Sequence, residues 1–185
     1  MKLVIIRHGE TTFNVQNKVQ GQANPPLTEK GINQAKEAAA LLKNQMTDFK
    51  EIYCSTLQRA VKTAEVVRGN LKIPIKPDPR LSSRNLGLFS GKTLQEIETL
   101  WPKEYKMWIS GDVKFRPPEG ESTEENIKRT EDFICFIKTK YQHDEKILIV
   151  THRENIGFFY YLIKGKKMED PLGSIGNCTP YEFEI

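Results

Sequence analysis

Two aliphatic segments of this chain end in the same way. The first reads KLVIIRHGE from Lys2, and the second reads KILIVTHRE from Lys146. Each starts with a lysine, continues through four aliphatic residues, and has a histidine, His8 or His152, two positions after the aliphatic run. Short runs that are apolar on both faces and lack a helical period predict buried strands. Two of the three histidines in the chain therefore follow predicted strands at equivalent positions.

Segments with a helical period alternate with the strand-like segments. Strands are predicted near residues 2–6, 51–56, 146–150 and 180–185, and helices near 29–46, 57–69, 93–110, 122–141 and 155–165. Thr28 and Ser122 are suitable N-caps, and Pro102 interrupts the third helix. Strands that alternate with helices are typical of an α/β fold. We therefore expect a three-layer α/β/α sandwich with a largely parallel central sheet.

The length of the chain fits a single domain. With 185 residues the chain can bury a sizeable core. It contains neither a repeat of solenoid period nor a low-complexity tract. We expect one domain over residues 1–185, with a small cap formed by about residues 81–121.

Composition narrows the class of protein and its compartment. No apolar run approaches the roughly 20 residues of a membrane span, and no secretory signal is visible, so we expect a cytoplasmic protein without membrane contact. The three cysteines, Cys54, Cys135 and Cys178, are odd in number and lack metal-ligand spacing, which favours reduced thiols. The net charge of +4 is spread among acidic residues, so nucleic-acid binding is not expected.

Four basic side chains are predicted to meet at one edge of the sheet. Ligands of open α/β sheets bind beyond the carboxyl ends of the strands, where Arg7, His8 and His152 leave their strands. Arg59 opens the helix after the second strand, where free backbone N–H groups also favour an anion. These four groups would repel one another without a multiply charged anion between them. Phosphate, which arginine binds bidentately, is the candidate anion.

The same residues suit phosphoryl transfer without a metal ion or cofactor. A neutral imidazole can attack phosphorus and form a phosphohistidine, and nearby arginines lower the histidine pKa so that the ring stays unprotonated. The second histidine, when protonated, would stabilise charge on the transferred group. The alternatives are a hydrogen-bonded structural role for His8 and a surface ion pair between Arg59 and Glu65.

Five segments, in this order, resemble the histidine phosphatase (phosphoglycerate-mutase-like) superfamily. They are RHGETTFN at 7–14, VQGQANPPLTEKG at 19–31, CSTLQRAVKTAE at 54–65, PPEGES at 117–122 and VTH at 150–152. The resemblance implies that His8 becomes phosphorylated and that the other three basic residues hold the phosphoryl group. It also implies that Asn14 and the backbone around Gln20 and Gly21 face the ligand, and that no metal is used.

One position departs from that family pattern. In the phosphatase and mutase branch, a glutamate that protonates the leaving group occupies the position of Ser83, and a serine hydroxyl is too weak an acid for this role. In the acid phosphatase and phytase branch the acid closely follows the second histidine, as Glu154 follows His152. Glu154 is therefore the candidate proton donor; the alternative is a first-turn carboxylate that stabilises the helix. Asp78 and Glu121 are weaker candidates.

The sequence predicts a phosphatase that hydrolyses a small-molecule phosphomonoester in two steps. Ser83 and Arg153 are candidate substrate contacts, and the alternative for Arg153 is a side chain that points to solvent. One rival function is a phosphoglycerate-mutase-type phosphotransferase, for which the chain lacks long insertions. A second is a catalytically weak protein that binds or senses a phosphate ligand, which Ser83 favours. A third is a phosphatase for phosphoamino acids, which would need an open cleft.

Substrate identity is expected to depend on two variable segments. They are the cap and the GKKMEDP loop at residues 165–171. The sequence leaves the assembly state open, a homodimer included.

Overall fold

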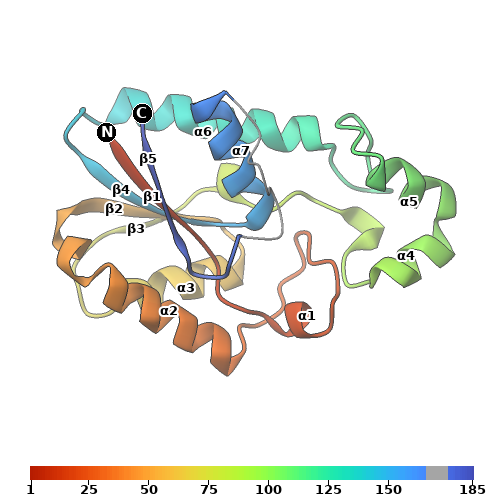
Figure 1. The fold of residues 1–185 in the computed structure, drawn as a ribbon, viewed down its shortest axis with the longest axis horizontal. Coiled ribbons are helices and arrows are strands. Elements are labelled where there is room, and N and C mark those ends of the chain that lie inside the picture. Colours follow the sequence, from red (N-terminus) through yellow and green to blue (C-terminus); the bar gives the residue numbers. More distant parts are fainter. Residues whose placement is uncertain (166–174) are drawn as a thin grey trace.

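A five-stranded sheet in the order β3-β2-β4-β1-β5 forms the centre of the computed structural model, which describes residues 1–165 and 175–185 (Figure 1). The strands are β1 (Lys2–Arg7), β2 (Phe49–Cys54), β3 (Ile75–Pro77), β4 (Lys146–Thr151) and β5 (Pro180–Glu184). The first four run parallel to one another, and β5 pairs antiparallel with β1 at one edge. The predicted α/β fold with a largely parallel sheet is confirmed.

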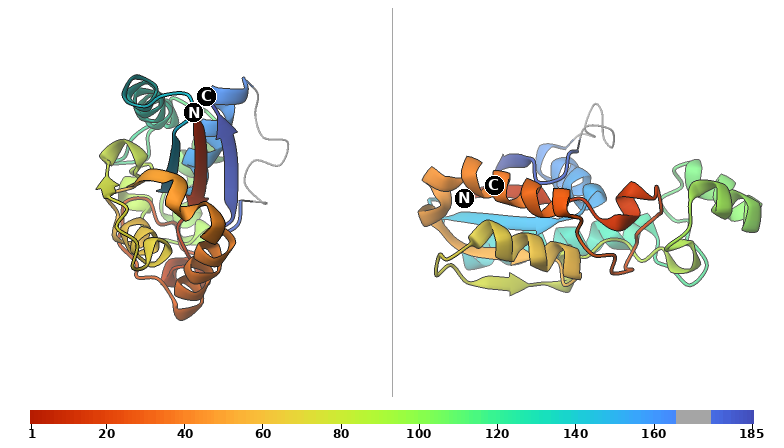
Figure 2. Two further views of the ribbon diagram at one scale, coloured as in Figure 1. Left: turned by 90° about the vertical axis from the view of Figure 1, so that its left-hand side faces the viewer. Right: turned by 90° about the horizontal axis from the view of Figure 1, so that it is seen from below.

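Helices cover both faces of the sheet and complete the three layers (Figures 1 and 2). They are α2 (Glu29–Leu41) and α3 (Gln58–Arg68) on one face, and α6 (Thr123–Lys140) and α7 (Arg153–Lys164) on the other. Alternate side chains of β1 serve the two cores: Val4 and Ile6 join the first, whereas Leu3 and Ile5 join the second. This is why the strand is apolar on both faces. Within the described ranges, no helix combines the length and the apolar character that crossing a membrane requires.

The segment predicted as a cap projects from one end of the molecule, away from the two chain termini (Figures 1 and 2). It carries α4 (Leu94–Leu100) and α5 (Pro102–Ile109). Its own buried apolar cluster consists of Leu86, Phe89, Ile97 and Phe115, with Trp101, Tyr105 and Trp108 packed against it. These aromatic side chains therefore hold the cap together.

One predicted helix is shorter than expected. Helix α2 ends at Leu41, and a 3₁₀ turn at Lys43–Asp48 leads into β2. Met46 is buried in this turn, and its contact with the core explains why the chain leaves the helix there. The predicted caps at Thr28 and Ser122 are confirmed, since each hydroxyl accepts a bond from a backbone N–H of its helix.

Besides two 3₁₀ helices at Pro79–Leu81 and Gly87–Phe89, one strand and one α-helix were not predicted. Strand β3 ends at Pro77 and follows Pro74, and these prolines indicated a break rather than a strand. β3 lies at the edge of the sheet, where a strand tolerates the missing N–H of proline. The other element is the four-residue helix α1 (Thr12–Val15), which a capping box between Thr11 and Asn14 holds in place.

Candidate active site

Pairing of β1 with β4 brings the two predicted histidines together. The strands are parallel, with Arg7 opposite Thr151, so His8 and His152 leave neighbouring strands at the same level. Their ring centroids lie 5.1 Å apart, with 59° between the ring planes. Each residue is only 3% exposed. We refer to His8 and His152 as the histidine pair.

Arg59 bridges the histidine pair. It lies in the first turn of α3 and is 1% exposed. Its Nε donates to Nε2 of His8, and its Nη2 lies against Nδ1 of His152, both at 3.3 Å. The same guanidinium donates to the carbonyls of Gly21 at 2.8 Å and Ala23 at 2.6 Å. The loop that contains Gly21 therefore closes against the site, which explains why so little of His8 reaches solvent.

Hydrogen bonds assign the tautomer of each ring. Nδ1 of His8 lies 2.8 Å from the carbonyl of Gly9, which can only accept, so Nδ1 carries the proton and the lone pair is on Nε2, where it accepts from Nε of Arg59. A guanidinium can only donate, so Nδ1 of His152 accepts from Arg59, and Nε2–H of His152 donates to Oγ of Ser55 at 2.8 Å. The lone pair on His8 therefore faces the basic cluster, as a nucleophile for an anion must.

Burial and positive charge keep both histidines neutral. Burial lowers the pKa of His8 well below its usual value, and Arg59 and then Arg7 lower it further. Burial is also the main reason that the pKa of His152 lies well below its usual value, with Arg59 as the next cause. The predicted neutral nucleophile agrees with these shifts. A bound phosphate dianion would oppose them and favour the protonated form of His152.

Arg7 adds a second desolvated guanidinium. Burial lowers the pKa of Arg7 to about 10, with a smaller effect from Arg153, and burial followed by repulsion from Arg7 lowers the pKa of Arg59 to about 10. Nη1 of Arg7 donates to the carbonyl of Ile175 at 3.0 Å, whereas its buried Nε has no partner among the described residues. No carboxylate within residues 1–165 and 175–185 forms an ion pair with either arginine. A buried positive cluster of this kind favours an anion.

Sequence reasoning missed the residue that fixes the backbone next to His8. Oγ1 of Thr63, which is fully buried, accepts from the N–H of Gly9 at 3.0 Å and donates to the carbonyl of Arg59 at 2.7 Å. Thr63 lies one helical turn after Arg59 on α3. The spacing of Arg59 and Thr63 in the motif QRAVKT was the signal that could have identified it.

Sequence reasoning also missed a row of hydroxyls beside His152. Oγ of Ser55 contacts His152 and lies 3.4 Å from Oγ of Ser82, which in turn lies 3.0 Å from Oγ1 of Thr56. Ser55 and Ser82 are both buried. These hydroxyls hold the second imidazole in orientation, and the cluster of small polar residues after β2 was the signal for them.

Glu154, the predicted proton donor, is paired with a buried arginine. It lies in the first turn of α7, and its Oε1 is 3.1 Å from Nη2 of Arg84. The Arg84 side chain is 4% exposed and also donates to Oγ1 of Thr123. Ser83 precedes Arg84 and is half-buried, and its carbonyl accepts from Nε2 of Gln22 at 3.1 Å. Sequence reasoning gave Arg84 no role.

The remaining predicted contacts differ in their placement. Oδ1 of Asn14 accepts from the backbone N–H of Thr11 at 3.0 Å, so this atom serves the local capping box. Oε1 of Gln20 is buried without a partner among the described residues. Arg153 is exposed on the first turn of α7. Apart from Gly165, the GKKMEDP loop lies outside the described residues.

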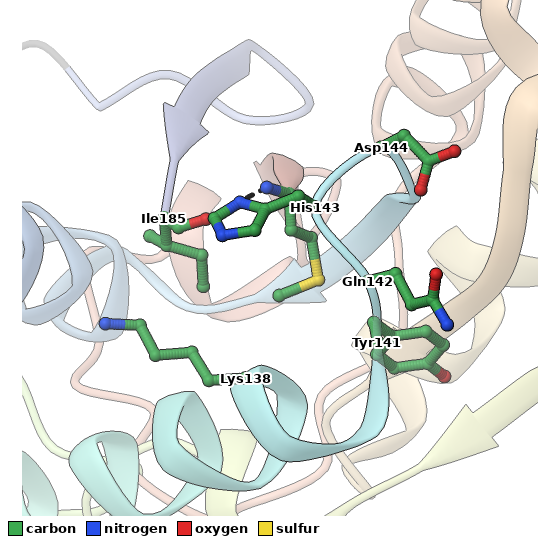
Figure 3. Close-up of a pocket in the computed structure, with 7 residues that line it drawn as sticks. Lys138, Tyr141, Gln142, His143, Asp144 and Ile185 are labelled. Carbon is green, nitrogen blue, oxygen red and sulfur yellow. Dashed lines mark hydrogen bonds between the residues drawn. The ribbon is translucent and has the colours of Figure 1, made fainter.

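A large surface hollow lies far from the histidine pair, where the two chain termini meet (Figure 3). Its volume is about 800 Å³, and its lining is Met1, Lys138, Tyr141, Gln142, His143, Asp144 and Ile185. The amino group of Met1 donates to the carbonyl of Ile185 at 2.9 Å. His143 lies here in an exposed turn, as predicted. No group of three or more potential metal ligands occurs in the described part of the chain.

Known proteins resemble the whole chain. A family model described as histidine phosphatase superfamily (branch 1) matches residues 3–185. Adenosylcobalamin/alpha-ribazole phosphatase of Escherichia coli K12 is 31% identical over 83% of this chain and 74% of that protein. The 2,3-bisphosphoglycerate-dependent phosphoglycerate mutase of Bartonella tribocorum is 31% identical over 91% of this chain and 84% of that protein. The solved structure of Bacillus stearothermophilus YhfR is 32% identical, with a TM-score of 0.88 over 100% of this chain and 91% of that one.

Proposed function

Because the chain belongs to the histidine phosphatase superfamily, branch 1, as its motifs predict, we propose that it is a phosphatase that hydrolyses a small phosphomonoester through a phosphohistidine. The observation that carries the proposal is the buried cluster of the histidine pair with Arg7 and Arg59. Two desolvated guanidiniums surround a neutral imidazole whose lone pair faces them. This arrangement suits a phosphate dianion and a nitrogen nucleophile.

In the proposed first step the substrate phosphoryl group moves to His8. The Nε2 lone pair forms the N–P bond while the P–O bond to the leaving group breaks, and Arg7 and Arg59 neutralise the phosphoryl oxygens. The carbonyl of Gly9 holds the Nδ1 proton and so keeps Nε2 directed at phosphorus. With the dianion bound, His152 gains a proton and adds a further positive donor.

In the proposed second step water releases the phosphate. Water attacks phosphorus, the N–P bond breaks, and the electron pair returns to Nε2 of His8. A carboxylate is needed as the base that takes the proton of water, and Glu154 is the candidate. In the described structure its Oε1 lies 3.1 Å from Nη2 of Arg84, so this pair must open before Glu154 can take the proton.

Residues around the buried cluster of the histidine pair, Arg7 and Arg59 provide the other proposed substrate contacts. We propose that Asn14, Gln20 and the backbone of Gly21 lie nearest the phosphate, and that Ser83 and Arg153 contact the remainder. Oε1 of Gln20 accepts only and has no partner among the described residues, so it supports a contact with an N–H or O–H donor of the substrate rather than with a phosphate oxygen.

Turnover of 4-nitrophenyl phosphate tests the proposal. The wild-type chain should release phosphate and, after an acid quench that is brief enough to spare an N–P bond, carry phosphate on histidine. His8→Ala should abolish both signals, whereas His143→Ala, which changes an exposed histidine far from the site, should leave both unchanged. Turnover that survives in His8→Ala would contradict the phosphohistidine mechanism.

A phosphate-ligand binding protein is the second candidate, because His8 is only 3% exposed and the Gly21 and Ala23 carbonyls occupy Arg59. Calorimetric binding of a phosphate ester without any release of phosphate would favour it. A mutase would instead move the phosphoryl group to an organic acceptor, so product analysis of the same reaction separates the two enzymatic activities.

A further inference from the structure

Four carboxylates of the described residues that lie near the carboxyl edge of the sheet are held in ion pairs. They are Glu10 with Lys30 at 2.9 Å, Asp78 with Arg80 at 2.6 Å, Glu121 with Arg129 at 2.8 Å and Glu154 with Arg84 at 3.1 Å. This set includes every carboxylate that the sequence suggested as a proton donor. An acid that protonates a leaving group must carry a proton before the bond breaks, and each of these ion pairs opposes that form.

The ion pair of Glu154 is the clearest case. The guanidinium of Arg84 is almost fully buried, and no other carboxylate in residues 1–165 and 175–185 lies within ion-pair distance of it. Protonation of Glu154 would therefore leave a buried positive charge without a counter-ion, which is strongly unfavourable. Glu154 is therefore the counter-ion of Arg84 in the described structure.

Two of the other carboxylates are also biased toward the charged form. The hydrogen bond from Lys30 is the main cause that lowers the pKa of Glu10. Burial alone would raise the pKa of Asp78, but the hydrogen bonds from Arg80 outweigh burial and lower it. Neither side chain is suited to hold a proton near neutral pH.

The remaining groups at the site are poor acids. His152 is proposed to gain a proton when the dianion binds, but its Nε2–H is donated to Ser55 and its Nδ1 faces Arg59, so neither ring N–H is directed at a leaving group in the described structure. Ser55, Ser82 and Ser83 offer hydroxyls, which are far too weak to protonate an alkoxide. Among the described residues, no group is therefore placed to protonate a leaving group.

We infer, on the basis of the proposed function, that the physiological substrate has a leaving group that departs as a stable anion. Acyl phosphates, phosphoanhydrides and aryl phosphates share this chemistry, whereas alkyl phosphates do not. In the first step Nε2 of His8 forms the N–P bond, and the P–O bond electrons leave as a carboxylate, phosphate or phenolate. No proton is transferred to the leaving group in this step.

A series of aryl phosphates with phenols of graded acidity tests the inference, with ethyl phosphate as the alkyl member. We expect kcat/KM to fall steeply as the pKa of the phenol rises, and ethyl phosphate to be slower than phenyl phosphate by at least about 10²-fold, the usual contribution of a general acid. Turnover of acetyl phosphate, adenosine diphosphate and phosphotyrosine then shows whether the preferred substrate is an acyl phosphate, a phosphoanhydride or an aryl phosphate.

Substitution at position 83 gives the matched comparison. Ser83→Glu supplies a carboxyl group in addition to Glu154, which is already paired with Arg84, and should raise ethyl phosphate turnover selectively and flatten the slope. Ser83→Gln has the same size without the acid and should do neither. If Ser83→Glu does not fold, the wild-type slope alone decides the matter.

Two outcomes separate the inference from the function on which it rests. A flat wild-type slope, with turnover that still requires His8, would overturn the inference alone and would direct attention to Glu169 and Asp170, which lie outside the described residues. The absence of any turnover that depends on His8 would overturn the proposed function together with the inference.

Discussion

Replacement of Thr63 by valine should both destabilise the protein and lower its kcat. The change keeps the shape of the side chain and removes the hydroxyl that accepts from the buried N–H of Gly9 at 3.0 Å. An unsatisfied buried donor costs about 1–3 kcal/mol. In a chain of this size each kcal/mol lowers Tm by about 2–4 °C.

The effect on activity follows from the contact between Gly9 and the ring of His8. Its carbonyl orients the ring of His8 through Nδ1, so a shift of this residue misaligns the nucleophile. A misplacement of about 1 Å can cost about 10²-fold in rate, so we expect kcat to fall by roughly ten- to hundredfold. KM should change little, because Arg7 and Arg59 keep their places.

Two variants control for loss of packing alone. Thr63→Ser keeps the hydroxyl and should retain most of the wild-type kcat. Thr130→Val removes another fully buried helix hydroxyl, whose bond to the carbonyl of Asn126 spans 3.0 Å, and should affect Tm without lowering kcat. Thermal denaturation and steady-state turnover measure both effects. If Thr63→Val matches the wild type in Tm and kcat, the positioning argument is wrong.

Three further predictions concern stability. Both histidines stay neutral in the folded protein, whereas they bind protons in the unfolded chain once the pH is below the usual histidine pKa of 6.5. Without phosphate, the free energy of unfolding should therefore decrease as the pH is lowered below 6.5, by up to about 2.7 kcal/mol per pH unit for two histidines. Denaturant titration at several pH values measures this, and a constant stability between pH 7 and 5 would contradict it. Gly31→Ala places a Cβ 2.1 Å from the carbonyl of Glu10 and should cost at least about 1–3 kcal/mol. Gly157→Ala, in a helix with no atom nearby, should instead stabilise by up to about 1 kcal/mol, and equal Tm shifts would refute the contact argument. Glu154→Gln should lower the free energy of unfolding by about 1–3 kcal/mol, because it leaves Arg84 without its counter-ion. Adding Arg84→Met should restore most of this stability in a double-mutant cycle. Strictly additive effects of the two changes would contradict an interaction between the two residues.

The central strands and the histidine pair could be predicted because local and tertiary constraints agree there. A strand buried on both faces must be aliphatic throughout, and Val4 and Leu3 do face different cores. The parallel register then places the two histidines side by side, as the matching segments indicated. By contrast, β3 forms only through its pairing with β2, and its local sequence, which contains prolines, does not indicate a strand.

The inner contacts of the site could be predicted only in part. Residue type and position indicated His8 after its strand and Arg59 at the start of its helix. The spacing of Thr63 from Arg59 shows only that the two share a helix face, not that the Thr63 hydroxyl meets Gly9, 54 positions away in sequence. The same limit applies to Arg84, whose partner Glu154 is 70 positions away. Polar pairs of this kind become visible only when the fold brings their elements together.

The pair of Arg84 and Glu154 connects the architecture to the chemistry. Arg84 lies at a junction of three elements: its own segment near Ser82, the start of α6 at Thr123, and the start of α7 at Glu154. A buried guanidinium at such a junction requires a counter-charge whatever reaction the protein performs. Glu154 supplies that charge, and a carboxylate committed to this role is not free to carry a proton to a leaving group. If the proposed function holds, the electrostatic need of this junction is what would favour substrates whose leaving group departs without a proton.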